Sequence, residues 1–303
     1  MNRQVIKPRL LFMDIYQAPK PETNAAPPEP PRHRMLEDIA RELSSDVVFP
    51  TSFDTVTRLH AALEDPEIGL AQIGALITVD PLVSARVLAL ANSTAYNPAG
   101  DAVQTLPKAI ERLGVENVRI VALALLARQM LQARESAAFR DLGTRIWAHS
   151  LHTASAAFVL ARKLTRVNAD EALLAGLIHD LGACYMIYRG AHYDDLVARP
   201  DDLQRLLSDW HESIGHTLAI ALGLPQKLAD AILDQDGPRD WPDPLLSLAD
   251  VVYVANLMAG GAARWQQKPL TLPEGQAELR QELFDRFGAD IDAHHQTLTA
   301  AFA

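Results

Sequence analysis

Cysteine is almost missing from this 303-residue chain, which has Cys184 alone. A single cysteine excludes an intrachain disulfide, and this composition fits a reducing compartment. We expect Cys184 to be a small buried apolar residue rather than a thiol nucleophile.

Long hydrophobic runs are missing too. The apolar stretch RLLFMDIY at residues 9–16 is too short to cross a bilayer, and Asp14 interrupts it. It also lacks the hydrophobic region and the small-residue cleavage site of a secretory signal. The sequence therefore predicts a soluble cytoplasmic protein without a membrane partner.

Basic residues are too few for a protein that coats nucleic acid. Lysine and arginine number 28 against 38 acidic residues, which gives a net charge of −10. Neutralisation of phosphates supplies most nonspecific affinity for nucleic acid, so we expect no nucleic-acid partner. The 49% apolar content is ample for one large core or two smaller ones.

Proline is concentrated at the N-terminus, where residues 1–34 hold seven of the nineteen prolines. Such a segment stays extended and cannot pack a core, so we predict a Pro-rich arm. Within it, residues 7–17 could form one short strand or a docking peptide. They also resemble the opening strand of a response-regulator receiver domain, although a mobile arm with an apolar patch is the simpler interpretation.

From residue 35 onward the pattern is typical of successive helices. Pro81 suits the first turn of a helix, with Asp80 as its N-cap, and Gly114 suits the end of another that has Pro107 in its first turn. Apolar residues recur at helical spacing, and residues 115–131 are apolar on most faces, which predicts a central buried helix. Further helices are expected at 52–66, 141–164, 170–188, 201–222, 225–235, 243–260 and 272–300. No convincing strand pattern appears between 35 and 300, so the predicted fold class is all-α.

The stretch DPLVSARVLALANSTAY at residues 80–96 resembles the signature of HDOD domains, D-P-x-L-x-x-R-L-L-x-x-A-N-S-x-x-Y. Colinear blocks such as ALLAGLIHDLG and HESIGHTLAIALGLP extend the resemblance over roughly residues 48–260. The resemblance implies a multi-helix bundle of two helical subdomains whose second half is HD-like. The residues of ANSTAY themselves indicate a helix stop, with Tyr96 burying its ring and keeping its hydroxyl on a polar partner.

This resemblance sets the expected domain organisation. The extended Pro-rich arm covers residues 1–34, and the HDOD domain covers residues 35–265. Within that domain we expect an N-terminal helical subdomain at 35–140 and an HD-like helical subdomain at 141–265. A C-terminal helical segment, residues 266–303, completes the chain.

HDOD domains are relatives of HD-superfamily phosphohydrolases, which hold a divalent metal with a His, a His-Asp doublet and a later Asp. Carried over to this chain, that pattern implies His149, the doublet His179–Asp180, and Asp250 as metal ligands, with His211 as an additional candidate. Imidazole and carboxylate ligands together suit Zn, Mn, Fe or Ni better than Mg or Ca. His152, one helical turn after His149, could be an outer-shell partner.

Three departures from the enzymatic relatives argue against a two-metal site. The His-His pair that often follows is replaced by Asp234-Gln235-Asp236, and no GYP-type motif follows the doublet. The lysine expected in HDLGK is also replaced, by Ala183. The set is therefore at most mononuclear, and the alternative of buried histidines that serve only packing remains open.

The resemblance implies a regulatory module of bacterial signal transduction that acts mainly through protein–protein interaction. Its expected partners are receiver, diguanylate cyclase or phosphodiesterase modules. An alternative is a metal-dependent HD-type phosphohydrolase acting on a nucleotide or cyclic dinucleotide, with His179 and Asp180 as catalytic residues. A third interpretation is a sensor that binds a metal or nucleotide without turnover. The sequence has no Gly-rich phosphate loop and no arginine cluster beside the doublet, so regulation is the favoured prediction.

Overall fold

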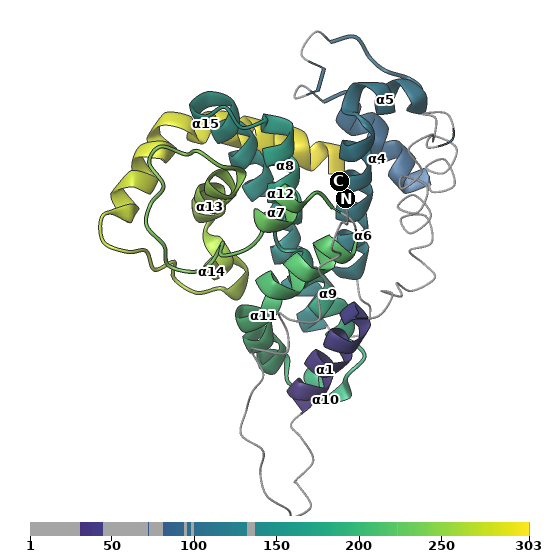
Figure 1. Ribbon diagram of the computed structural model, residues 1–303, viewed down its shortest axis with the longest axis vertical. Coiled ribbons are helices and arrows are strands. Elements are labelled where there is room, and N and C mark those ends of the chain that lie inside the picture. The colour runs from purple at the N-terminus through teal and green to yellow at the C-terminus, as the bar shows by residue number, and fades with distance from the viewer. Residues whose placement is uncertain are drawn as a thin grey trace, which may run out of the picture.

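A computed structural model describes residues 31–44, 72, 81–93, 96–97, 100–131, 137–222 and 224–302 (Figure 1). Within those ranges every regular element is a helix, which confirms the all-α prediction. The Pro-rich residues 1–30 and the helix expected at 52–66 lie outside the described residues, as does Asp80.

The N-terminal part contributes helices α1 (Pro31–Ser44), α4 (Pro81–Ala91), α5 (Leu106–Leu113) and α6 (Val115–Leu131). Helix α1 begins inside the segment expected to be an extended arm, because Pro31 suits the first helical position. Its buried residues Met35, Ile39 and Leu43 recur every four positions and form one apolar face. This helix packs against α10 and α11 of the other half.

The remaining helices form the HD-like half and the C-terminal segment. They are α7 (Ala137–Leu164), α8 (Ala169–Ile178), α9 (Leu181–Gly190), α10 (Asp194–Ala198), α11 (Pro200–Ala221), α12 (Gln226–Asp230), α13 (Leu248–Ala259), α14 (Gly261–Gln266) and α15 (Gln276–Phe302). Helix α7 is central, because α6, α8, α13, α14 and α15 all pack against it. Helix α15 also reaches α4, and Arg128 of α6 donates a hydrogen bond to the Phe302 carbonyl, so this segment joins both halves.

The single helix expected at 170–188 is wrong, because the chain forms two helices that meet at His179 and Asp180. The His179 ring donates through Nδ1 to the carbonyl oxygen of Gly176 at 2.8 Å, which competes with helix continuation. Asp180 has a backbone conformation of φ −93° and ψ 21°, outside the helical range. The break places both polar side chains at a corner inside the core. The helices expected at 225–235 and 243–260 are also shorter, since residues 231–247 form a loop.

The helix stop predicted around Asn92 is confirmed. Its side-chain amide donates to the carbonyl of Val103 at 2.8 Å and accepts from the amide of Val103 at 2.7 Å. This pair of bonds fastens the end of α4 to the segment before α5. The expectation for Tyr96 is wrong, because its ring is largely buried but its hydroxyl has no hydrogen-bond partner among the described residues. Burial raises the pKa of this hydroxyl far above its usual range.

Candidate metal centre

A cluster of polar side chains lies in the core of the HD-like half, where several helices converge. Its members come from α7, the α8–α9 corner, α11, the 231–247 loop and α13: His149, His179, Asp180, His211, Asp236 and Asn256. The exposed fraction is 2% for His149, 3% for His179 and 2% for Asp180. Polar groups buried this deeply must satisfy one another or bind a ligand.

Three of the predicted ligands form the first group, which consists of His149, His179 and Asp180. The Nε2 atoms of the two histidines are 3.2 Å apart, and Nε2 of His179 is 3.3 Å from Oδ2 of Asp180. Nε2 of His149 is 3.9 Å from the same carboxylate oxygen. These three atoms lie close enough together to hold one metal ion. Nε2 of His149 offers a lone pair only in the tautomer that carries the proton on Nδ1.

Two glycines that flank the doublet allow this convergence. A Cβ at Gly176 would lie 2.8 Å from Cα of Ala154, so α8 can cross α7 closely only with glycine there. A Cβ at Gly182 would lie 1.9 Å from the His211 carbonyl oxygen and 2.5 Å from the amide nitrogen of Gly215. The helix backbones therefore touch on both sides of the doublet. This contact brings the side chains of α7 and α11 to it.

The orientation of His179 is that of a metal ligand. Nδ1 donates to the Gly176 carbonyl, which leaves Nε2 facing the group as the nitrogen that can bind a metal. Oδ2 of Asp180 is buried and has no hydrogen-bond donor among the described residues. An unsatisfied buried carboxylate oxygen beside imidazole lone pairs is costly, and a divalent cation at that place would compensate for it. The residues present therefore fit such an ion.

His149 is neutral in this environment. Burial lowers its pKa to about 4, with the Asp180 carboxylate opposing that shift. Its Nδ1 is buried without a hydrogen-bond partner in the described part of the chain, whereas Nδ1 of His179 has the Gly176 carbonyl. His152 does not take that place, since its ring lies against His295 with the ring centroids 5.1 Å apart.

A second group, His211, Glu212 and Asp236, lies next to the first. His211 donates through Nδ1 to the Leu207 carbonyl at 2.6 Å, and its Nε2 is 3.1 Å from Oδ2 of Asp236. Burial opposes the charge of His211, but the bond and the attraction to Asp236 prevail and raise its pKa to about 9. With both nitrogens donating, His211 offers a lone pair to a metal only after losing the proton on Nε2. The Glu212 carboxylate accepts the backbone amides of Gln235 and Asp236.

Asp250 lies apart from the first group. Its Oδ1 accepts from Arg239 at 2.6 Å, and its Oδ2 accepts the backbone amide of Ser247 at 2.9 Å. Ser247 in turn caps α13, which makes a capping box at the start of that helix. The resemblance-based assignment of Asp250 as the fourth ligand therefore has no support in this geometry, because both carboxylate oxygens are already used.

The sequence reasoning overlooked Asn256 and gave Asp236 no role. Asn256 is fully buried in α13, and its Oδ1 is 2.9 Å from Nε2 of His149. A signal was present in the sequence, since an asparagine within the apolar run VVYVANLMA must find polar partners. Asp236 lies in the stretch that was noted only for lacking the His-His pair.

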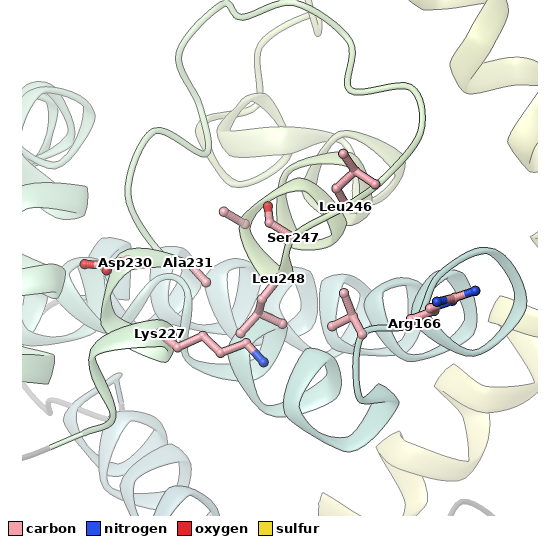
Figure 2. Close-up of a pocket in the computed structure, with 9 residues that line it drawn as sticks. Arg166, Lys227, Asp230, Ala231, Leu246, Ser247 and Leu248 are labelled. Atoms are coloured by element: carbon pink, nitrogen blue, oxygen red, sulfur yellow. The ribbon is translucent and has the colours of Figure 1, made fainter.

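A separate cleft of about 380 Å³ lies where the α7–α8 connection, α12 and the start of α13 meet (Figure 2). Its apolar lining includes Val167 and Leu248, while Arg166 and Lys227 contribute cations. Leu246, 78% exposed, stands at its edge. Lys227 is paired with Glu171, whereas no described residue pairs with Arg166. None of the polar residues of the two groups lines this cleft.

A comparison with known families identifies the family of this chain. The profile of the HDOD domain matches residues 49–238, which is more than half of the chain. The chain belongs to the HDOD family. The resemblance read from residues 80–96 is thereby confirmed, and the two groups described above lie within or next to the matched region.

Solved structures share the fold. A Shewanella amazonensis protein provisionally named a metal-dependent phosphohydrolase matches with a TM-score of 0.66 and 18% identity, over 90% of this chain and 99% of that one. An HDOD domain protein of unknown function from Geobacter sulfurreducens matches with a TM-score of 0.53 and 20% identity, over 88% and 98% of the two chains. At these identities the likeness concerns the fold alone, which confirms the HD-like architecture.

One curated relative, an uncharacterized protein from Treponema pallidum, is 24% identical over 233 residues. The match covers 71% of this chain and 43% of that protein, so the chain spans less than half the length of this relative. In the described part of the chain, no helix combines the length and the apolar character needed to cross a bilayer.

Proposed function

We propose that this chain is a regulatory module of bacterial signal transduction. In this proposal it acts by binding partner proteins, and its buried first group holds one divalent metal that stabilises the fold. The observation that carries the proposal is the burial of a ligand set that fits a cation. Regulation by an HDOD protein agrees with the family, and the metal and the partner contact are our inferences.

Burial favours a structural metal over a catalytic one. With the first group at most 3% exposed, a phosphate ester could reach the ion only if helices moved apart. The cation already within the site, protonated His211, is engaged by Asp236 and is not free to bind a phosphate. When bound, a metal would supply charge that balances Asp180 and fix the spacing of α7, α8 and α9.

Metal analysis tests the first part of this proposal. We expect purified protein to bind close to one equivalent of Zn²⁺ or Mn²⁺ and to melt at a lower temperature after chelation, because a ligand specific to the folded state raises stability. His179→Ala should abolish that metal dependence, while His216→Ala, a matched change at a partly exposed histidine of α11, should retain it. Wild-type protein that binds neither ion and melts identically with and without chelator would refute the metal.

The cleft beside Leu246 is the surface that we assign to partner contact. Its apolar lining and the unpaired Arg166 suit a peptide segment that carries an apolar side chain and a carboxylate. In capture from a bacterial lysate, we expect the tagged wild-type protein to retain a signalling protein at a defined ratio. The Leu246→Asp variant should no longer retain that protein. Leu279→Asp, at an exposed leucine elsewhere, is the matched control. Equal retention by all three proteins would contradict this assignment.

The alternative, a metal-dependent phosphohydrolase, is favoured by one observation, which is the first group itself. It predicts metal-dependent release of phosphate or cleavage of a cyclic dinucleotide that disappears in Asp180→Asn. We expect no turnover across a panel of nucleotides in metal-loaded protein. Turnover that is lost in Asp180→Asn would replace our proposal with this one.

A further inference from the structure

We propose that Asn256 supplies, through Oδ1, the fourth donor of the metal site, in the place that the family resemblance gives to Asp250. This inference rests on the proposed metal and goes beyond it by assigning a ligand. It begins from the fact that α13 presents only one of these two side chains to the first group.

The spacing along α13 separates the two candidates. Asp250 and Asn256 are six residues apart, which corresponds to about 600°, or about 240° around the helix axis. The two side chains therefore stand about 120° apart around the axis and do not share one face of the helix. The contacts agree, since Asp250 bonds to Arg239 and Ser247, whereas Asn256 bonds to His149.

The partners of Asn256 fix the direction of its amide. Its Nδ2 donates to the Gln235 carbonyl at 3.0 Å and to Oδ1 of Asp236 at 2.9 Å. Both partners can only accept, so the reversed amide would place oxygen against oxygen. Oδ1 of Asn256 is consequently held toward Nε2 of His149. A neutral amide oxygen in this position is a hard donor of the kind that completes a mixed imidazole and carboxylate set.

The separations between the donors match those around a small divalent ion. Ligands at about 2.0–2.1 Å from a tetrahedral ion are about 3.3–3.4 Å apart, and octahedral neighbours are about 2.8–3.0 Å apart. Nε2 of His149 is 2.9 Å from Oδ1 of Asn256 and 3.2 Å from Nε2 of His179. Nε2 of His179 is 3.3 Å from Oδ2 of Asp180. Nε2 of His149 and Oδ2 of Asp180 are farther apart, at 3.9 Å, so these two side chains would have to close by about 0.5 Å around a tetrahedral ion.

Asn256 also joins the two groups. Through Asp236 it contacts the carboxylate that pairs with His211, and through His149 it contacts the first group. The bonds from its Nδ2 to Gln235 and Asp236 hold Oδ1 in place, and neither of them involves the metal. This arrangement gives the site a donor that is positioned before an ion arrives, which favours binding because little ordering remains to be done.

Cobalt substitution tests this ligand directly. A thiolate bound to Co²⁺ gives an intense near-ultraviolet charge-transfer band, and the native Cys184 provides the background in wild-type protein. We expect Asn256→Cys loaded with Co²⁺ to show this band, and the matched variant Asp250→Cys to lack it. Asn256→Leu should weaken Zn²⁺ binding at least about tenfold. Asp250→Asn should remain within about twofold of wild type.

A measurement on wild-type protein covers the case in which the Asn256 variants do not fold. Zn²⁺ should shift the side-chain amide signals of Asn256 in a nitrogen-labelled sample. If wild-type protein binds Zn²⁺ but these signals do not move, or if Asp250→Cys shows the cobalt band instead, the inference is overturned and the proposed metal stands. If wild-type protein binds neither Zn²⁺ nor Co²⁺, both are overturned.

Discussion

The first and second groups lie side by side in one core but balance their charges differently. In the second group, His211 is protonated and its Nε2 donates a hydrogen bond to Oδ2 of Asp236, so the charges of these two side chains cancel. In the first group, His149 is neutral and Oδ2 of Asp180 has no donor among the described residues. The polypeptide itself supplies the partner of the His211 charge in the second group. In the first group, Oδ2 of Asp180 has no such partner among the described residues.

This difference explains how one cluster can contain a structural ion pair and a ligand site. The protonated His211 supplies a cation to the cluster, at the position that the family resemblance offered as an additional metal ligand. The adjoining Asp180 meets this cation only through Oδ1, 3.7 Å from Nε2 of His211, while its Oδ2 lacks a donor among the described residues and is available to a metal. The predictions below test that contrast, beginning with the largest expected effect.

The largest effect should come from Asp236→Asn. The substitution removes the nearer counter-ion of the buried His211 imidazolium and leaves Oδ1 of Asp180 at 3.7 Å. Breaking a buried pair typically costs about 3–5 kcal/mol, and we expect the lower end because the Asp236 side chain is 20% exposed. Urea unfolding of the metal-free protein measures this loss. A change below about 1 kcal/mol would show that the pair is not the charged, buried unit described here.

The pH dependence should distinguish the two groups through their histidines. The pKa of His211, raised to about 9, gives a stabilisation that is complete below about 6.5 and is lost as the pH rises through about 9. The pKa of His149, lowered to about 4, gives a stabilisation that is present above about 6.5 and is lost as the pH falls through about 4.

Each contribution amounts to at most about 3 kcal/mol. The free energy of unfolding of metal-free protein should therefore be greatest near pH 6.5. His211→Gln should remove the decline on the alkaline side and keep the acidic one. If both limbs persist in His211→Gln, the alkaline decline arises from another residue.

A smaller effect of opposite sign is expected for Asp180→Asn. Removing a carboxylate that lacks a donor should leave the stability of metal-free protein unchanged or raise it by up to about 2 kcal/mol. The same change should weaken metal binding. Destabilisation as large as that of Asp236→Asn would erase the proposed difference between the groups.

The smallest effect is expected for Asp230→Asn, which breaks a second His–Asp pair, formed by His216 of α11 and Asp230 of α12. Nε2 of His216 is 3.2 Å from Oδ1 of Asp230, nearly the same distance as in the buried pair, but the Asp230 side chain is 58% exposed. An exposed pair contributes about 1 kcal/mol or less. A loss comparable to that in Asp236→Asn would mean that burial is not the deciding factor.

The sequence predicted the fold class from helical periodicity, and the family resemblance singled out the three residues that the structure brings together in the first group. Helical periodicity identified most helices, and the His-Asp doublet stood out in an apolar stretch. The helix break at His179 was hidden, since it depends on the side chain's bond to Gly176 and on close crossings that glycine allows. These are tertiary contacts that override helix propensity.

The role of Asp250 could not be predicted from family order alone. A motif gives the position of an acid along the chain, but the capping box at Ser247 and the contact with Arg239 decide which way it points. Asn256 was missed because asparagine is not among the residue types that the resemblance assigns to metal. Only the packed structure shows that its face of α13 meets His149.

The backbone contact between Gly182 and Gly215 has a mechanical consequence. With no side chains between them, α9 and α11 approach until their backbone atoms touch, so any side chain at Gly182 would force the two helices apart. Because the doublet immediately precedes α9 and His211 lies on α11, this contact sets the spacing of the inner polar atoms.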